Sequence, residues 1–153
     1  MKKVLIIYHS QQKGNTKKAA ELVEKGCKQV PGVEVELFNT NMGRVDIKKA
    51  TAADALVFGT PDYCSYMAGG LKQFFDDLIF AIWDGKIIKG KPCAVFVTHG
   101  GKGEAAAASV DEMLKALELK KVTKSLVCYG EPKGEAADRA IAIGKALADF
   151  ISK

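Results

Sequence analysis

Residues 4–16 read VLIIYHSQQKGNT, and this stretch decides the fold of the chain. The continuous apolar run from Val4 to Tyr8 predicts a strand that is buried on both faces. The polar residues that follow predict a loop, and the amphipathic run after them predicts a helix. A loop between a buried strand and a helix N-terminus directs backbone N–H groups and side-chain donors at one point. The segment therefore predicts a binding site for a phosphate.

The spacing of glycines and donors in this loop excludes two common phosphate motifs. The loop lacks the Gly-x-x-x-x-Gly-Lys-Ser/Thr pattern of a P-loop and the Gly-x-Gly-x-x-Gly pattern of a dinucleotide-binding turn. Its donors are mostly neutral side chains of Ser, Gln, Asn and Thr, and one glycine lets the backbone turn. We expect such a loop to hold a phosphate through neutral donors more than through charge.

The length and composition predict one globular domain. The chain has 153 residues, of which 48% are apolar and 27% are charged. No apolar run approaches the roughly 20 residues of a membrane span, so we expect no membrane segment. The N-terminal lysines precede an apolar run that is too short for an export signal. Four cysteines without a Cys-x-x-Cys pair and only two histidines predict free thiols, no metal site and a cytoplasmic location.

The net charge of +5 comes from lysines that are interspersed with acidic residues. Proteins that read nucleic acids usually cluster arginines into basic stripes, and this chain has few arginines, so we expect no nucleic-acid partner. The positive charge instead favours encounters with an acidic redox partner.

Strand-like and helix-like runs alternate along the chain. This alternation predicts a three-layer, doubly wound parallel sheet with helices on both faces. Continuous apolar runs predict central strands, whereas the alternating second run predicts an edge strand, which together favour five strands in the order 2-1-3-4-5. The predicted strands are Lys3–Tyr8, Val33–Phe38, Ala55–Gly59, Cys93–Thr98 and Val122–Tyr129.

Apolar residues at helical spacing predict the helices between these strands and after the last one. We interpret the stripes as core, including the strong stripe from Leu71 to Ile82. Trp83 follows that stripe, so we expect it in the core or packed at the helix end. The segment Asp46–Ala53 predicts only a short, weak helix.

Three loops follow the three central strands and should therefore open on the same edge of the sheet. The loop His9–Thr16 is suited to a phosphate. The loop Thr60–Gly70 carries two tyrosines and a methionine, which are suited to the face of a planar ring. The loop His99–Glu104 contains three glycines, so its backbone can approach the edge of a ligand. A phosphate at one end and a flat aromatic system at the other describe flavin mononucleotide (FMN).

On these segments the chain resembles the flavodoxin-like superfamily over nearly its whole length. It is most similar to the FMN-binding flavodoxin family and to the related WrbA-type NAD(P)H:quinone oxidoreductases. The matching segments are Val4–Val23, Gly59–Asp76 and Thr98–Glu104. The middle segment is the most specific, because it combines a Gly-Thr-Pro-x-Tyr start with Met-Ala-Gly and an aromatic-rich helix.

The resemblance implies a single flavodoxin-like FMN-binding domain over residues 1–153 and assigns roles to all three loops. Residues implied to hold the phosphate are Ser10, Gln11, Gln12, Gly14, Asn15 and Thr16. Residues implied to cover the isoalloxazine ring are Thr60, Pro61, Asp62, Tyr63, Cys64, Ser65, Tyr66 and Met67. Residues implied to contact its pyrimidine edge are His99, Gly100, Gly101 and Gly103. Lys13 lengthens the first loop by one residue, which leaves open which of Gln11, Gln12 and Lys13 faces the phosphate.

Two functions are compatible with this resemblance. The first, which we favour because no separate nicotinamide motif is present, is an electron carrier between redox partner proteins. The second is an enzyme that accepts hydride from NAD(P)H and reduces a quinone. Both use the flavin as the redox centre, so neither requires a catalytic side chain or a metal. The oligomeric state remains open. His9 and His99 either contact the ligand or simply bond to loop backbone.

The second loop has a further consequence for its backbone. No glycine lies between Asp62 and Met67. Flavodoxins often stabilise the flavin semiquinone by a peptide flip, which would here need a positive φ at an ordinary residue, at a steric cost of about 1–2 kcal/mol. The resemblance therefore implies weak stabilisation of the semiquinone.

Overall fold

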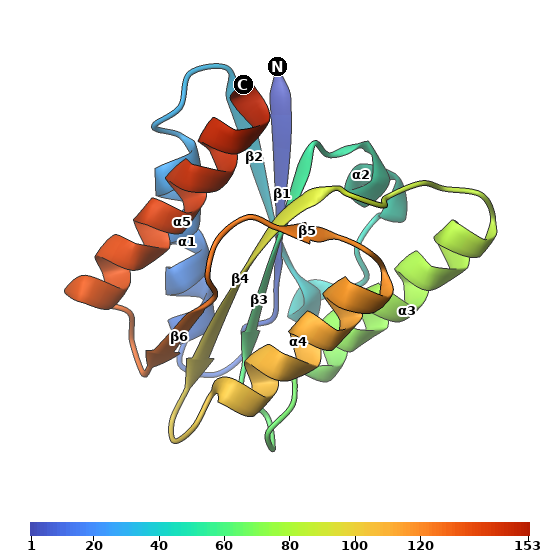
Figure 1. Ribbon diagram of the computed structural model, residues 1–153. Coiled ribbons are helices and arrows are strands. Elements are labelled where there is room, and N and C mark those ends of the chain that lie inside the picture. Colours follow the sequence, from blue (N-terminus) through green and yellow to red (C-terminus); the bar gives the residue numbers. More distant parts are fainter.

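The computed structural model describes residues 1–153 as a parallel β-sheet between two layers of helices (Figure 1). The strands are β1 (Lys2–Tyr8), β2 (Val33–Asn39), β3 (Ala55–Pro61), β4 (Pro92–His99), β5 (Lys120–Lys121) and β6 (Leu126–Tyr129). The helices are α1 (Asn15–Cys27), the 3₁₀ turn η1 (Thr40–Met42), α2 (Ile47–Ala52), α3 (Gly69–Trp83), α4 (Glu104–Ala116) and α5 (Glu135–Ser152). No helix has both the length and the apolar character needed to cross a membrane.

The strand order β2-β1-β3-β4-β5 confirms the predicted 2-1-3-4-5 arrangement, and every pair is parallel. The predicted fifth strand differs, because it is divided into β5 and β6, which both pair with β4. Residues 122–125 separate β5 from β6, whereas only residues 94–95 separate their partners Cys93 and Phe96. The additional residues cannot stay in register with β4, so they leave the sheet.

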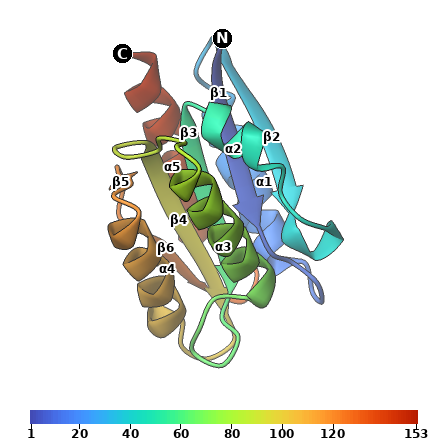
Figure 2. The same cartoon turned by 90° about the vertical axis from the view of Figure 1, so that its right-hand side faces the viewer.

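The two faces of the sheet carry two separate cores. On β1, Val4 and Ile6 pack against α1 and α5, whereas Leu5 and Ile7 pack towards α2, α3 and α4. The views in Figures 1 and 2 show these two helical layers on opposite sides of the sheet. The edge strand β2 alternates as predicted, because Val33 is buried and Glu34 is exposed. Burial of apolar residues on both faces thus explains why β1, β3 and β4 are central.

Helices α1 and α5 approach closely through small residues. A Cβ atom on Gly144 would lie 1.9 Å from the carbonyl oxygen of Val23, and a Cβ atom on Gly26 would lie 1.9 Å from that of Ile141. Backbone atoms cannot move aside as a flexible side chain can. Glycine at both positions is therefore what lets the two helices pack at this distance.

The apolar stripe of α3 packs on the sheet, but Trp83 does not follow it into the core. Phe74 and Phe75 lie against Phe58 of β3, with ring centroids 6.0 and 5.1 Å from that ring. Trp83 is the last residue of α3, is 72% exposed and contacts Phe80 edge to face, so it packs at the helix end and the alternative of a core position was wrong. One residue after Ile82 is a rotation of about 100° around a helix, which turns Trp83 away from the sheet.

Candidate functional site

The loops after β1, β3, β4 and β6 meet at the carboxyl edge of the sheet, at the bottom of Figure 1. They line an open cavity of about 440 Å³. Predicted site residues in its lining are Ser10, Gln11, Gln12, Gly14, Asn15, Thr16, Pro61, Asp62, Tyr63, His99 and Gly100. The lining also includes Lys13, Thr98, Tyr129 and Gly130. Three predicted loops thus converge, and a fourth joins them.

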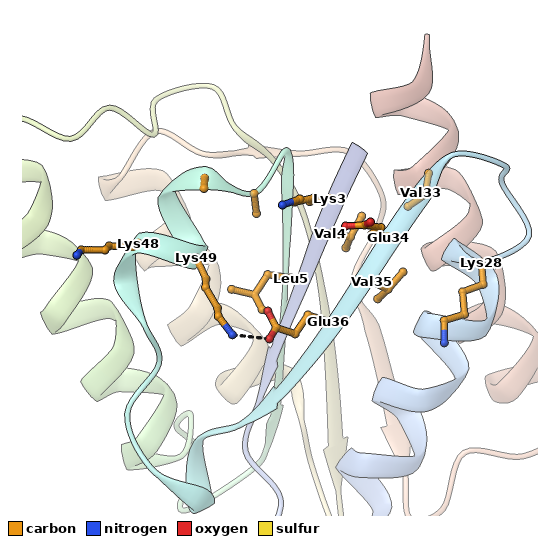
Figure 3. A pocket seen from close by; sticks show the side chains of 12 residues that line it. Lys3, Val4, Leu5, Lys28, Val33, Glu34, Val35, Glu36, Lys48 and Lys49 are labelled. Carbon is orange, nitrogen blue, oxygen red and sulfur yellow. Dashed lines mark hydrogen bonds and ion pairs between the residues drawn. The ribbon is translucent and has the colours of Figure 1, made fainter. Parts of the chain in front are cut away.

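A larger hollow of about 600 Å³ lies at the opposite end of the sheet, beside the edge strand β2 (Figure 3). Lys28 of α1 and Lys48 of α2 flank it, and Glu36 of β2 is already paired with Lys49 at 2.6 Å. This groove lies at the amino ends of β1 and β2. Ligands of doubly wound sheets bind outside the carboxyl ends of the strands, so the smaller cavity is the candidate site.

The first loop is anchored from the edge strand. The backbone N–H of Ser10 donates to Oδ1 of Asn39 at 3.0 Å, and Nδ2 of Asn39 donates back to the Ser10 carbonyl at 2.9 Å. The N–H of His9 donates to the carbonyl of Gly59 in β3 at 3.0 Å. Asn39 was not among the predicted site residues. Its position at the carboxyl end of a predicted strand, at the same edge as the loop, was the available signal.

The N-terminus of α1 is open towards the cavity. Gly14 occupies the N-cap position with φ of 77°, supplies no side-chain cap and is followed by no acidic residue in the first turn. The first N–H groups of the helix therefore remain available to an anion. Thr16 is buried, and its hydroxyl lies 2.8 Å from the hydroxyl of Thr98 at the end of β4. This contact fixes the helix start against the sheet.

The second loop forms a tight two-residue turn. Tyr63 and Tyr66 exchange backbone hydrogen bonds of 3.0 and 3.1 Å. The residues between them, Cys64 and Ser65, have φ of 53° and 64°, so both adopt the left-handed conformation. A turn with two positive φ values normally contains glycine or asparagine. Two ordinary residues of this loop therefore carry the steric cost of a positive φ.

Several predicted residues of the second loop do not line the cavity, because they are either buried in the core or exposed outside the lining. Met67 is only 3% exposed and packs in the core, with its N–H donating to the hydroxyl of Ser109 at 3.1 Å. Thr60 is fully buried, and its hydroxyl oxygen accepts from the N–H of Ala68 at 2.9 Å. Tyr66, Cys64 and Ser65 are exposed beside the cavity. Partial desolvation of the Tyr63 side chain raises the pKa of its phenol.

The third loop is joined to a fourth, which the sequence analysis did not include. The N–H of Gly130 donates to the carbonyl of His99 at 2.8 Å, and the rings of His99 and Tyr129 meet edge to face at 5.7 Å. Gly103 is buried under the imidazole, since a Cβ atom there would lie 2.6 Å from Cδ2 of His99. Gly101 is exposed and lies outside the lining.

Two buried polar atoms of the cavity residues have no hydrogen-bond partner in the protein. They are Oδ1 of Asp62 and Nδ1 of His99. Buried polar atoms are normally paired, so these two indicate a ligand that supplies donors and acceptors. One end of the cavity therefore presents neutral donors and a helix N-terminus, and the other presents tyrosines and unpaired polar atoms. This arrangement suits a flat polar molecule with an anionic tail.

Comparison with known proteins gives relatives along the whole chain. Residues 2–128 match the protein family described as NADPH-dependent FMN reductase. A protein named flavodoxin from Aquifex aeolicus is 33% identical, over 99% of this chain and 88% of that protein. A NAD(P)H dehydrogenase (quinone) from Methanosarcina barkeri is 31% identical over 67% of this chain. The chain spans only 62% of the length of that second relative.

Solved structures share the architecture. The structure of a flavodoxin from the domain Archaea superposes with a TM-score of 0.85, covering 99% of both chains at 21% sequence identity. At this level of identity the likeness establishes the fold.

Proposed function

This chain belongs to the flavodoxin-like superfamily, within the family described as NADPH-dependent FMN reductase, and from that membership we propose that it binds FMN and carries electrons as a flavodoxin does. The observation that carries this proposal is the cavity at the carboxyl edge of the sheet. It combines an uncapped helix N-terminus, a loop of neutral donors and two unpaired buried polar atoms. We treat residues 1–153 as one FMN-binding domain.

The first loop would hold the phosphate of FMN. Residues 10–16 line the cavity, and the N–H groups at the start of α1 have no side-chain cap. A helix N-terminus stabilises a negative charge that lies close to it. Lys13 adds a positive charge to the lining and forms no ion pair within the protein. The phosphate would therefore be held mainly by neutral donors, with Lys13 contributing charge at the rim.

The other loops would hold the ring system and the polyol chain. Tyr63 and Tyr129 bring aromatic surface to the lining from two different loops. The Asp62 carboxylate would accept from a ligand N–H or hydroxyl group, and Nδ1 of His99 would complete its hydrogen bonding with a ligand atom. Bound FMN supplies the one- and two-electron chemistry. The role of the chain is to orient the flavin and to control which molecules reach it.

An electron-carrier role is favoured over an enzyme by the extent of the comparisons. The relative named flavodoxin aligns over 99% of this chain, whereas the named quinone dehydrogenases align over about two thirds of it. The net charge of +5 would speed encounters with an acidic redox partner protein. Four cysteines without a disulfide support a reducing compartment such as the cytoplasm.

NAD(P)H-dependent reduction of a quinone is the second candidate. The family description and the named quinone dehydrogenases favour it. Relatives with that name are longer than this chain, which covers 62% and 61% of two of them.

Reconstitution tests both candidates in sequence. Apoprotein titrated with FMN should quench flavin fluorescence at a one-to-one ratio, and failure to take up FMN at any concentration would refute the proposal. The FMN-loaded protein is then mixed with NADH or NADPH and a benzoquinone. Near-zero turnover supports the carrier, whereas many turnovers per second support the quinone oxidoreductase.

A further inference from the structure

His9 is the first residue of the first loop, and it lies outside the cavity lining. Its side chain is only 7% exposed and lies against Thr40 of the turn η1 and Gly70 at the start of α3. A Cβ atom on Gly70 would lie 2.7 Å from Nδ1 of His9, so the ring fills the space that this glycine leaves. The imidazole also meets the ring of Tyr63 edge to face at 6.0 Å. His9 therefore packs against the site without reaching the space of a ligand.

The two ring nitrogens of His9 have different partners. Nε2 lies 2.5 Å from Oε1 of Gln11, and Nδ1 lies 2.9 Å from Oγ1 of Thr40. An amide oxygen can only accept, so Nε2 carries the hydrogen of the first bond. In the neutral ring Nδ1 then accepts from the Thr40 hydroxyl. The bond to Oε1 leaves the NH₂ group of Gln11 as the part of its amide that a ligand can use.

We infer that His9 is a positioning residue for the phosphate end of the site, acting through Gln11. By holding Oε1, His9 fixes the Gln11 amide with its NH₂ group available to the cavity that Gln11 lines. This inference rests on the proposed binding of FMN. If FMN binds there, His9 and Gln11 together contribute to the preference of the site for FMN over riboflavin, which is the same molecule without the phosphate.

The inference also distinguishes Gln11 from its two neighbours. Gln12 and Lys13 line the same cavity, are exposed and have no buried group that holds their side chains. Immobilising a flexible side chain on binding costs about 0.5–1.5 kcal/mol. The contact with His9 removes that cost for Gln11 before the ligand arrives. Gln11 is therefore the side chain of the three that is prepared to donate to a phosphate.

Dissociation constants for FMN and for riboflavin, measured with apoprotein by fluorescence quenching, test the inference. Gln11→Ala should weaken FMN binding about 10- to 100-fold, as expected for one hydrogen bond to a charged group. His9→Asn, which keeps a polar atom near Thr40 but cannot reach Gln11, should weaken it about 2- to 10-fold. His9→Gln places an amide near the original Nε2 position and should restore binding to within about twofold of wild type. Riboflavin binding should not respond to any of these changes.

The double variant His9→Asn with Gln11→Ala separates positioning from an independent effect. If His9 acts through Gln11, the double variant binds FMN no more weakly than Gln11→Ala alone. Gln73→Ala is the matched control, since Gln73 is an exposed glutamine on α3 outside the cavity, and it should leave both constants unchanged. The Gln11 variants alter an exposed side chain, so folding does not depend on them.

Each failure has its own signature. If wild-type protein does not bind FMN, the proposed function is wrong. If wild-type protein binds FMN but His9→Asn weakens FMN and riboflavin equally, His9 only supports the fold and the inference is overturned. Full additivity of the two substitutions, or unchanged FMN binding by Gln11→Ala, would overturn it as well.

Discussion

Replacing Ser65 with glycine should stabilise the protein, because Ser65 occupies the left-handed conformation at φ of 64°. This conformation costs an L-residue about 1–2 kcal/mol, and glycine removes that cost. Glycine also makes the unfolded chain more flexible, which lowers the free energy of unfolding by about 0.4–1 kcal/mol. The expected net gain in the free energy of unfolding is therefore about 0.5–1 kcal/mol. In a chain of this size, that corresponds to a rise in Tm of about 1–4 °C.

The matched control is Ser65→Ala, which keeps a Cβ atom in the same backbone conformation. It should give no comparable gain in the free energy of unfolding. Urea denaturation of the apoprotein measures both variants, and the same pair measured with FMN bound reports whether the turn keeps its shape around the ligand. An equal gain in both states means that Tyr63 and Tyr66 keep their reciprocal backbone bonds. A stability that is unchanged or lower in Ser65→Gly, or equally raised in Ser65→Ala, would refute the strained turn.

Three other predictions follow from the packing and the charges. In native protein a thiol reagent should modify exposed Cys64 alone, because burial disfavours the other thiolates and raises the pKa of Cys27 to about 12. The unfolded chain ionises its thiols at lower pH, so the free energy of unfolding should fall as the pH rises above about 9. Gly144→Ala should destabilise the protein by about 1–3 kcal/mol in urea, although alanine favours helices, because its Cβ atom meets a backbone carbonyl. Arg44 lowers the pKa of Asp77, so Arg44→Ala should raise that pKa in an NMR titration, and the stability from this pair should disappear as the pH falls through the lowered value.

Much of the architecture could be predicted because the β1, β3 and β4 runs are buried on both faces. The sequence of a strand buried on both faces is continuously apolar, whichever strands it pairs with. The division of the fifth strand was not predictable, because residues 122–125 read VTKS and continue a β-like pattern. Only the register against β4 shows that this segment has two residues more than the segment of β4 that it would have to pair with. For Trp83 the core alternative was wrong and the helix-end alternative was confirmed, because a single step beyond an apolar stripe changes the face of a helix.

The candidate site was predictable where its residues lie in one continuous loop. The first loop, the end of β3 and the start of the third loop all reach the cavity. Asn39 and Tyr129 were missed because they stand at the carboxyl ends of the outer strands, whereas the predicted site residues all follow the three central strands. Met67 was assigned to the ligand because its thioether suits the face of a planar ring, but its side chain fills the core beneath α3 and α4. Which residues of a loop turn inward depends on tertiary contacts that a single sequence does not contain.

The central claim is that the carboxyl edge of the sheet is where this protein holds FMN. Backbone amide chemical shifts, followed by NMR while FMN is added to the apoprotein, test it residue by residue. The account predicts large shift changes in residues 10–16, 61–63, 98–100 and 129–130, which line the smaller cavity. Shift changes centred on residues 33–36 and 48–49, in the groove of Figure 3, would contradict it, as would a spectrum that FMN leaves unchanged.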